Sequence, residues 1–442
     1  MKHFINMLEE MPLKRAEKQN FTSLFSSLFE NSEFRLTIVL VFFSALVLNF
    51  SGTLLSIFYI KVWKVDDSLV GLFLALNCSQ ILFFLIPGYL VEKYGIKVTY
   101  LIGTSVTIIT FLLIIFVRNL WFHVFAISLS FGFASTLLYG ALKAGTTEAT
   151  TTLNRSLGFS LFNSAYNFST IALGLIYELV FYLNGINFTS YNILFFILSG
   201  FFVLNFILII LFSKLGKSAS THSQKIRINE ILNQKRYWKT LAVIFFSAIP
   251  LAGVFLPGII LPIYMDRELG STAGYGLFFA AYSLMLGIFS ISLNFVTVYC
   301  SLYDCIVLGG LITASGPLVF GYGASYFTIG IYLTITAAGG AIIEPRIFDY
   351  NGFASVKGHE GFYYGIASFG YAFTAVFTGF MSGYMLDEFC PENGERECWK
   401  MWYALAGFCA AGVILLMALK PLIEVVRDHQ EIDPYIFSSH LS

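Results

Sequence analysis

Charge is scarce in this sequence, and its two signs balance. Only 12% of the 442 residues are charged, whereas soluble chains average about 25%. The 26 basic and 26 acidic residues cancel, so no strong field would attract nucleic acid. Hydrophobic residues make up 57% of the chain, and the mean hydropathy is +0.76. This composition predicts an integral membrane protein surrounded by the lipid bilayer.

The sequence also lacks the motifs of many enzymes and channels. It has no phosphate-binding GxxxxGK[ST] loop and no nucleophile elbow, and its six histidines are scattered rather than clustered at metal-ligand spacing. A repeated pore ring, typical of a channel, is missing. We therefore expect no enzymatic activity, no cofactor and no metal site. Residues 1–30 lack an apolar core with a cleavage site, so no removable signal peptide is expected.

Long apolar runs dominate what is present. Runs of about 20 residues, the length that crosses a bilayer, recur along the chain. The expected spans are residues 35–60, 68–91, 98–117, 120–145, 156–183, 190–213, 239–264, 271–297, 302–319, 325–345, 361–386 and 399–420. The chain is thus predicted to be an all-α polytopic membrane protein with twelve transmembrane helices.

A basic linker divides these spans into two sets of six. The expected parts are an N-terminal tail (1–34), a first six-helix bundle (35–213), a linker (214–238), a second six-helix bundle (239–420) and a C-terminal tail (421–442). With both termini inside, the inner segments carry 20 of the 26 Lys and Arg residues. Cytoplasmic loops usually hold this excess, so we expect both termini in the cytoplasm, with the plasma membrane as the default location.

The two halves share a weak repeat. Residues 140–168 and 340–373 each place a short polar island between two apolar segments. The triplet Gly-Ala-Leu at 140–142 is echoed by Gly-Ala-Ile at 340–342. Parallel repeats of this kind are typical of transporters built from two helical bundles.

The loop between the second and third expected spans carries a recognisable motif. Residues 88–97 read GYLVEKYGIK, which resembles the signature Gly-x-Leu-x-Asp-x-x-Gly-Arg-Lys of the major facilitator superfamily. Glu92 takes the acidic place, Gly95 the turn and Lys97 the basic end, whereas Ile96 replaces the usual arginine. The resemblance implies two pseudo-symmetric six-helix bundles and secondary-active or facilitative transport of a small organic solute by alternating access. We expect a monomer.

Charged residues of the loop motif and the two polar islands are candidates for a gate. The islands fall at the inner ends of spans four and five and of spans ten and eleven, where charges in this superfamily commonly latch the two bundles together. An opposite charge nearby keeps such groups ionised in a partly dry interface. A substrate or proton site and ordinary rim charges are the alternatives. The gating candidates are Glu92, Lys97, Lys143, Glu148, Arg155, Glu344, Arg346 and Glu360.

Polar side chains near the middle of the bilayer are mostly amides and phenols. Asn163, Tyr166 and Asn167 share one face of the fifth span, since they are three and four residues apart. We expect this stripe to face a substrate, and the alternative is that it hydrogen-bonds neighbouring helices. The substrate-binding candidates are Asn49, Asn77, Gln80, Asn163, Tyr166, Asn167, Tyr282 and Tyr371.

Faint resemblances to two branches of the superfamily narrow the range of candidate substrates. Arg155 with the Ile-Tyr-Glu and Gly-Ile-Asn-Phe segments at 176–178 and 185–188 is similar to facilitative amino-acid transporters of the superfamily. Arg155 followed by Phe159 and an asparagine-bearing fifth span is similar to its peptide transporters. This implies an amino acid or short peptide as the substrate. The alternatives are another small metabolite (a sugar, carboxylate or drug-like compound) and a transport-dead sensor or scaffold on the same fold.

Coupling to a proton stays open, because it would need a titratable group in the cavity. Glu148, Glu178 and Glu344 are the nearest candidates, but none lies clearly at the midplane. A co-transported proton, a uniporter and an exchanger are therefore all compatible with the sequence.

Cysteine spacing predicts one further feature. Cys390 and Cys398 bracket a charged loop that the topology places outside, where an oxidising compartment would permit a disulfide; two free thiols are the alternative. Asn187 begins an Asn-Phe-Thr sequon in another outer loop and is a glycosylation candidate in a eukaryotic secretory route.

Overall fold

The computed structural model describes ten segments of the chain. They are residues 21–65, 72–73, 80–151, 154–185, 187–212, 235–270, 275–294, 300–355, 360–391 and 397–420. Most of the predicted linker, most of the N-terminal tail and the C-terminal tail lie outside these residues, as does Asn77. Within the described segments the chain is helical, without a strand, which confirms the predicted all-α membrane fold.

Helices before residue 213 are called the first half here, and those from residue 235 onward the second half. The first half contains α2 (Phe21–Glu30), α3 (Ser32–Lys61), α5 (Gln80–Phe83), α6 (Ile86–Phe116), α7 (Leu120–Phe122), the π-helical turn η1 (His123–Ile127), α8 (Ser128–Ala149), α9 (Arg155–Asn184) and α10 (Phe188–Phe212). The second half contains α12 (Lys235–Ala248), η3 (Ile249–Leu251), α13 (Ala252–Ile259), α14 (Leu261–Leu269), α15 (Tyr275–Ser292), α17 (Leu302–Ser315), η4 (Gly316–Tyr322), α18 (Tyr326–Ala354), α19 (Glu360–Phe389) and α20 (Cys398–Ala418).

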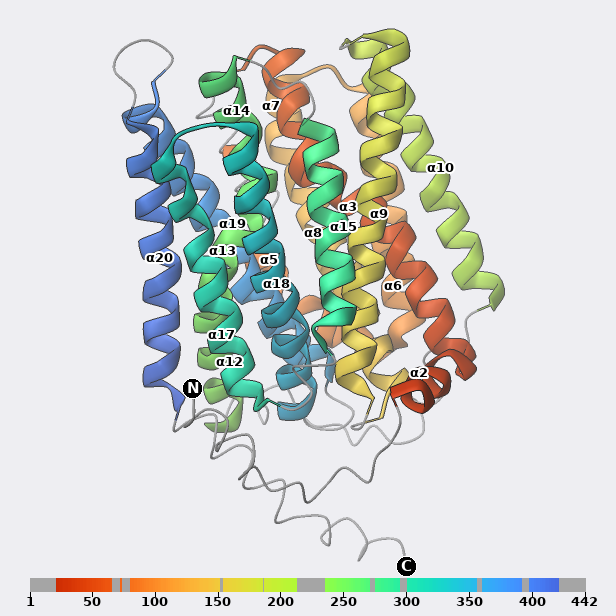
Figure 1. Ribbon diagram of the computed structural model, residues 1–442. Coiled ribbons are helices and arrows are strands. Elements are labelled where there is room, and N and C mark those ends of the chain that lie inside the picture. The colour runs from red at the N-terminus through yellow and green to blue at the C-terminus, as the bar shows by residue number, and fades with distance from the viewer. Residues whose placement is uncertain are drawn as a thin grey trace, which may run out of the picture.

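Ten helices among the described residues are long and apolar enough to cross a membrane. The first predicted span corresponds to α3, and the second falls on α5 and the start of α6. The helices stand side by side, with α2 at one end and α7 and α14 at the other (Figure 1). We call the end that carries α2 the α2 side.

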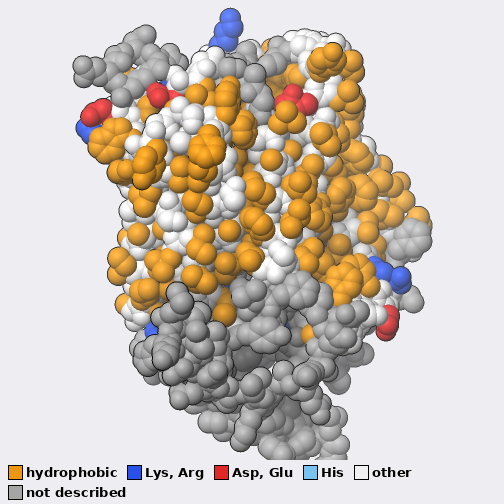
Figure 2. Space-filling view, in the orientation of Figure 1, with side chains coloured by type: hydrophobic (Ala, Val, Ile, Leu, Met, Phe, Trp, Pro, Cys, Tyr) orange, Lys and Arg blue, Asp and Glu red, His pale blue; other side chains and the backbone are white. Residues whose placement is uncertain are grey.

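The surface agrees with immersion in lipid. Hydrophobic side chains cover the middle of the face in Figure 2, and the visible charged side chains gather towards its two ends. Exposed residues of α15 and α17 include Leu277, Leu284, Ile288, Leu308 and Leu311. Apolar side chains that face outward in this number are stable against hydrocarbon rather than water.

The loop motif forms the turn that its sequence predicts. Helix α6 is interrupted at Gly95, whose φ of 84° and ψ of 166° are not helical. A residue with a side chain rarely adopts this φ, which explains the glycine. On the far side of the turn, the Lys97 Nζ donates to the Ile210 carbonyl of α10 at 3.1 Å. The motif thereby ties the beginning of the third span to the end of the sixth.

A long antiparallel seam between α9 and α15 joins the two halves. The Ser156 hydroxyl donates to Asn294 (3.1 Å) just beyond the end of α15, and the Ser164 hydroxyl donates to the Gly287 carbonyl (2.8 Å). At the other end Glu178 lies against Gly276. Small residues on both helices permit this close approach along almost their whole length, as in other membrane helix pairs. The two helices lie next to each other in Figure 1.

On the α2 side, a second contact between the halves is built on two glycines. A Cβ atom added at Gly361 of α19 would lie 3.0 Å from the Gly88 Cα of α6 and 3.3 Å from the Val91 Cβ. A Cβ atom added at Gly88 would lie 2.7 Å from the Phe362 nitrogen. Backbone therefore packs on backbone here, and the two halves are closed against each other at this end.

Helix α2 docks on the same side of the first half. Leu28 is buried against Phe34, Leu157 and Leu161. The Asn31 Oδ1 accepts from backbone N–H groups at the start of α3, while its Nδ2 donates to the Ala149 carbonyl at 3.0 Å. The short helix therefore braces the connection between α8 and α9.

Adding a side chain at Gly361 should separate the halves on the α2 side. We expect Gly361→Val to enrich a longer distance between spin labels at Thr151→Cys and Ser355→Cys, measured by double electron–electron resonance. The matched control is Gly407→Val in α20, where an added Cβ meets nothing within 4 Å. Identical distance distributions for Gly361→Val and the parent protein would show that this packing does not hold the halves together.

Candidate functional site

A lysine and a glutamate from different halves lie together inside the helical bundle. Lys143 of α8 is only 6% exposed, and its charge interacts with the Glu344 carboxyl of α18. At 1.5 Å per residue they lie roughly 9 Å and 15 Å from the ends of their helices at Ala149 and Ala354. Among the described residues, no ion-pair contact joins the two groups directly. A base and an acid thus lie near each other inside the bundle without pairing directly, Lys143 buried and Glu344 half-buried.

Aromatic rings surround the Lys143 ammonium. Its Nζ lies 4.2 Å from the ring centre of Phe348, 5.4 Å from that of Tyr371 and 5.5 Å from that of Tyr139. Phe348 and Tyr371 are themselves stacked, with centroids 5.4 Å apart and planes at 16°. A desolvated cation over aromatic faces gains about 2 kcal/mol. The rings therefore replace part of the hydration that Lys143 gives up.

Amide and hydroxyl groups complete the surroundings of Glu344. Its carboxyl lies beside the Asn163 amide, whose Nδ2 donates to the Ser290 hydroxyl at 3.1 Å. The Asn167 Nδ2 donates to the Asn163 Oδ1, also at 3.1 Å. The buried Tyr371 hydroxyl lies near Glu344 and has no hydrogen-bond partner among the described residues.

Two sets of residues that the sequence suggested separately therefore meet. Lys143 and Glu344 were gating candidates, whereas Asn163 and Tyr371 were substrate-binding candidates. We call these four residues the central cluster. Tyr166 joins its edge through the Tyr139 ring (centroids 5.8 Å apart), and the Tyr282 hydroxyl donates to the Val254 carbonyl at 3.1 Å while interacting with Glu344. Nothing is described of the side chains of Asn49 and Gln80.

A second polar group lies between the central cluster and the α2 side. The Arg346 Nη2 donates to the Asn294 Oδ1 (3.2 Å), and its Nη1 lies 3.8 Å from the Asp349 Oδ2. The same Asn294 oxygen accepts from Ser156 of the first half. Asp349 also interacts with the Arg155 charge across the halves. We call these five residues the gate layer.

Aromatic contacts and one short hydrogen bond reinforce this closure. The hydroxyls of Thr147 (α8) and Tyr364 (α19) lie 2.5 Å apart. Phe159 of α9 packs on Phe348 and on Tyr364, with ring centroids 5.6 Å and 5.9 Å away. These three contacts each cross from one half to the other and cover the central cluster on the α2 side.

Comparison with known sequences identifies the family. A sequence model of the Major Facilitator Superfamily matches residues 37–257, half of the chain. The chain belongs to this superfamily. No curated protein matches the sequence.

Solved transporters of the superfamily share the fold. The human organic anion transporter MFSD10 (TETRAN) superposes with a TM-score of 0.65 at 13% identity, covering 87% of this chain and 99% of that one. The nucleoside transporter NupG gives a TM-score of 0.62 at 13% identity, covering 88% and 99%, and a point mutant of NupG gives 0.63 at 14%, covering 88% and 100%. At these identities the likeness concerns the fold alone.

The remaining gating candidates lie further from the central cluster than the gate layer does. Glu148 is exposed near the end of α8, and Glu92 is half-buried in α6 just before the turn of the motif. Nothing is described of the Glu360 side chain. Asp349, Asn294 and Ser156 were not singled out by the sequence as site residues. Asp349 belongs to a polar island, whereas no local pattern distinguishes Asn294 or Ser156.

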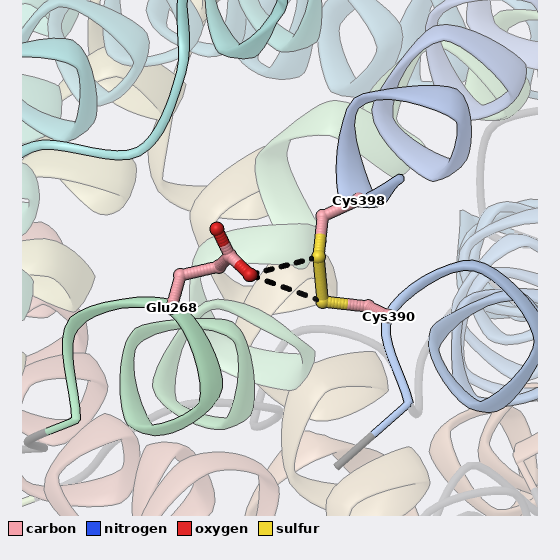
Figure 3. Close-up of side chains that lie close together, drawn as sticks. All are labelled: Glu268, Cys390 and Cys398. Atoms are coloured by element: carbon pink, nitrogen blue, oxygen red, sulfur yellow. Dashed lines mark hydrogen bonds between the residues drawn. A yellow bond between two sulfur atoms is a disulfide. The ribbon is translucent and has the colours of Figure 1, made fainter. Parts of the chain in front are cut away.

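Opposite the α2 side, the structure joins Cys390 and Cys398 by a disulfide. The Glu268 Oε1 lies 3.2 Å from the Cys398 Sγ and 3.9 Å from the Cys390 Sγ, as Figure 3 shows. These three residues have the donor types of a metal site. Because both sulfurs are used in the disulfide, they offer no thiolate to an ion.

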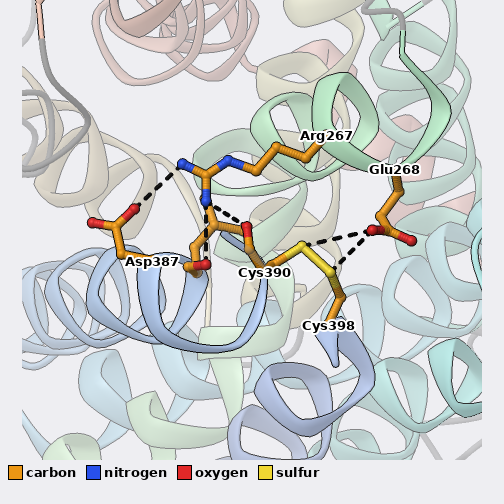
Figure 4. The surroundings of a disulfide bond; sticks show 6 residues. Arg267, Glu268, Asp387, Cys390 and Cys398 are labelled. Atoms are coloured by element: carbon orange, nitrogen blue, oxygen red, sulfur yellow. Dashed lines mark hydrogen bonds and ion pairs between the residues drawn. A yellow bond between two sulfur atoms is a disulfide. The ribbon is translucent and has the colours of Figure 1, made fainter. Parts of the chain in front are cut away.

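Arg267 fastens the same region (Figure 4). Its Nη1 donates to the Leu386 and Cys390 carbonyls at 3.1 Å and 2.7 Å, and its Nη2 pairs with Asp387 at 3.3 Å. A cation is favourable at the last turn of a helix, here α19. The disulfide and Arg267 together fix the ends of α14, α19 and α20.

Thiol labelling tests the disulfide. Without reductant, two fewer of the six cysteines should react with maleimide in the unfolded protein than after reduction. Peptide mass mapping should assign the protected pair to Cys390 and Cys398. Full labelling of both residues without reductant would contradict the bond.

The interaction across the gate layer can be measured by a double-mutant cycle. Arg155→Gln, Asp349→Asn and the double variant should each populate an arrangement open on the α2 side, detected by spin labels at Thr151→Cys and Ser355→Cys. We expect a coupling energy of about 1–2 kcal/mol, because residues within one ion network are not additive. The exposed pair Lys400 and Glu397 is the matched control. Additive populations for Arg155 and Asp349 would remove them from the gate.

Proposed function

We propose that this superfamily member transports an amino acid or short peptide by alternating access. The observation that carries the proposal is that a buried lysine, Lys143, and a half-buried glutamate, Glu344, come from different halves and lie near each other without direct ion-pair contact. A buried charge is costly unless it is paired and hydrogen-bonded. A zwitterion offers one partner to each member of the pair.

The chemistry of the central cluster matches the two ends of an amino acid. The α-carboxylate would accept from the Lys143 ammonium, whose recorded partners are the aromatic rings and the charge of Glu344. The α-ammonium would donate to the Glu344 carboxyl and be surrounded by its amide and phenol neighbours. The Tyr371 hydroxyl, which has no described partner, is a further donor for the carboxylate.

Substrate release would require the halves to rock about the central cluster, as in other two-bundle carriers. The contacts between the halves that must break on the α2 side are the Arg155–Asp349 interaction of the gate layer and the Thr147–Tyr364 hydrogen bond. The seam of α9 and α15 is long and well packed, which suits it to be the pivot. The excess of basic residues supports a cytoplasmic α2 side, so the structure would be closed to the cytoplasm.

Two features of the carrier follow as parts of the proposal. A co-transported proton, if the cycle uses one, would be held on Glu344, the carboxyl of the central cluster. The site lies wholly between the two halves of one chain, which supports a working monomer, with the plasma membrane as its location.

A thermal-shift screen of the purified protein tests the zwitterion. Amino acids and dipeptides should raise the melting temperature, because a ligand at 100 times its Kd stabilises the folded state by about 2.7 kcal/mol. Analogues that carry only the carboxylate or only the amine should fail, as should nucleosides and sugars. Repeating the screen at pH 5.5 and 7.5 shows whether a proton is bound with the ligand.

Variants of the pair make the result specific. Lys143→Met and Glu344→Gln should each abolish the shift, whereas Lys93→Met at an exposed position of α6 should preserve it. Stabilisation by organic anions that survives Glu344→Gln would replace the zwitterion with an anionic substrate. Stabilisation by no compound in any class, in folded protein, would favour the sensor or scaffold.

A further inference from the structure

Three aromatic side chains pack together at the central cluster and form an apolar surface to which the proposed function has given no role. Phe348 of α18 and Tyr371 of α19 are stacked, and Phe255 of α13 meets the Tyr371 ring edge-on with centroids 6.2 Å apart. The Lys143 ammonium lies over Phe348 at 4.2 Å. One of these rings, that of Tyr371, lies in the surroundings of both Lys143 and Glu344.

Binding of a substrate carboxylate would change which group covers the Phe348 ring. A charge-assisted hydrogen bond to a carboxylate is stronger than a contact with an aromatic face. Lys143 would therefore turn from Phe348 towards the substrate and uncover an apolar face in the closed interior. An uncovered face without a partner loses its dispersion contacts. The substrate's own side chain is the group positioned to cover it.

We propose that Phe348 and Tyr371 form the side-chain subsite, and that the substrate is a neutral amino acid with an aromatic or large aliphatic side chain. This inference rests on the proposed function, since it presupposes that the backbone groups of an amino acid bind Lys143 and Glu344. An aromatic side chain would stack or meet Phe348 edge-on, as aromatic pairs prefer. A small side chain would leave the ring face uncovered.

The charges of the cluster also exclude other side chains. A cationic side chain in this subsite would lie close to the Lys143 ammonium and be repelled by it. An acidic side chain would add a second buried anion near Glu344 without adding a cation. Neutral side chains keep the loaded site electrically balanced, and among them apolar ones also cover the Phe348 ring face.

Competition binding with the purified full-length protein tests the subsite. The ligands are glycine, alanine, leucine, phenylalanine, lysine and glutamate. Phenylalanine and leucine should bind at least about tenfold more tightly than alanine, because each methylene in an apolar pocket contributes on the order of tenfold or more. Lysine and glutamate should bind more weakly than alanine.

Substitutions of Phe348 separate the contribution of its aromatic ring to ligand binding from the contribution of its volume. Phe348→Leu should weaken phenylalanine binding about tenfold or more and change leucine binding little, whereas Phe348→Ala should weaken the binding of phenylalanine and leucine more than that of alanine. Phe327→Ala, at an exposed position of the same helix, is the matched control and should alter no ligand. If Phe348→Ala does not fold, the Phe348→Leu variant alone tests the aromatic subsite.

The outcomes distinguish the two levels of the proposal. Amino acids that bind equally whatever their side chain, or a rank order that Phe348→Leu leaves intact, would overturn the aromatic subsite and leave an amino-acid transporter. Failure of every amino acid to bind the parent protein would overturn both.

Discussion

Two opposite charges held apart in a nearly dry interior are the constraint to which the rest of this structure responds. An ammonium or carboxylate of this kind costs several kcal/mol even after relaxation, unless its surroundings replace water. The structure meets that cost with aromatic faces for Lys143 and with an amide and the opposite charge for Glu344. Because one charge belongs to each half, the compensation exists only while the halves are together. A ligand that bridges the two charges therefore acts directly on the arrangement of the halves, and binding and conformational change share the same atoms.

The contacts between the halves divide into two kinds with different consequences. The α9 and α15 seam uses small residues and backbone carbonyls along almost the whole length of both helices, so it changes little if the helices rotate about it. The gate layer consists of a few polar contacts at one end, each worth about 1 kcal/mol or somewhat more. A sum of a few kcal/mol is the size of difference that a bound ligand can reverse. Long, weakly polar packing thus suits a pivot, and a short polar layer suits a latch.

The sequence predicted the architecture well because the bilayer fixes the length and composition of a span, and because glycine in the loop motif reports a turn directly. It placed the buried charges less well. The predicted spans stopped at residues 145 and 345, where polarity rises, whereas α8 and α18 continue beyond those points by one turn or more. Lys143 and Glu344 consequently lie inside the bundle rather than at its rim. Asn294 carried no signal at all, since its part in the gate layer depends on partners far away in the chain, which hydropathy and local spacing do not encode.

The way the protein balances its two buried charges bears on the transport cycle. A carrier must return without substrate unless it exchanges one substrate for another, and a return with two uncompensated charges would be slow. Here the rings beside Lys143 and the neighbours of Glu344 compensate both charges with protein groups alone in the closed arrangement. A zwitterion leaves the net charge of the site unchanged, so neither the loaded nor the unloaded step needs an additional ion to neutralise it. If the cargo is the zwitterion proposed above, these electrostatics would favour a facilitator over an obligatory exchanger, whereas an anionic cargo would leave Glu344 without a cation and would require a proton.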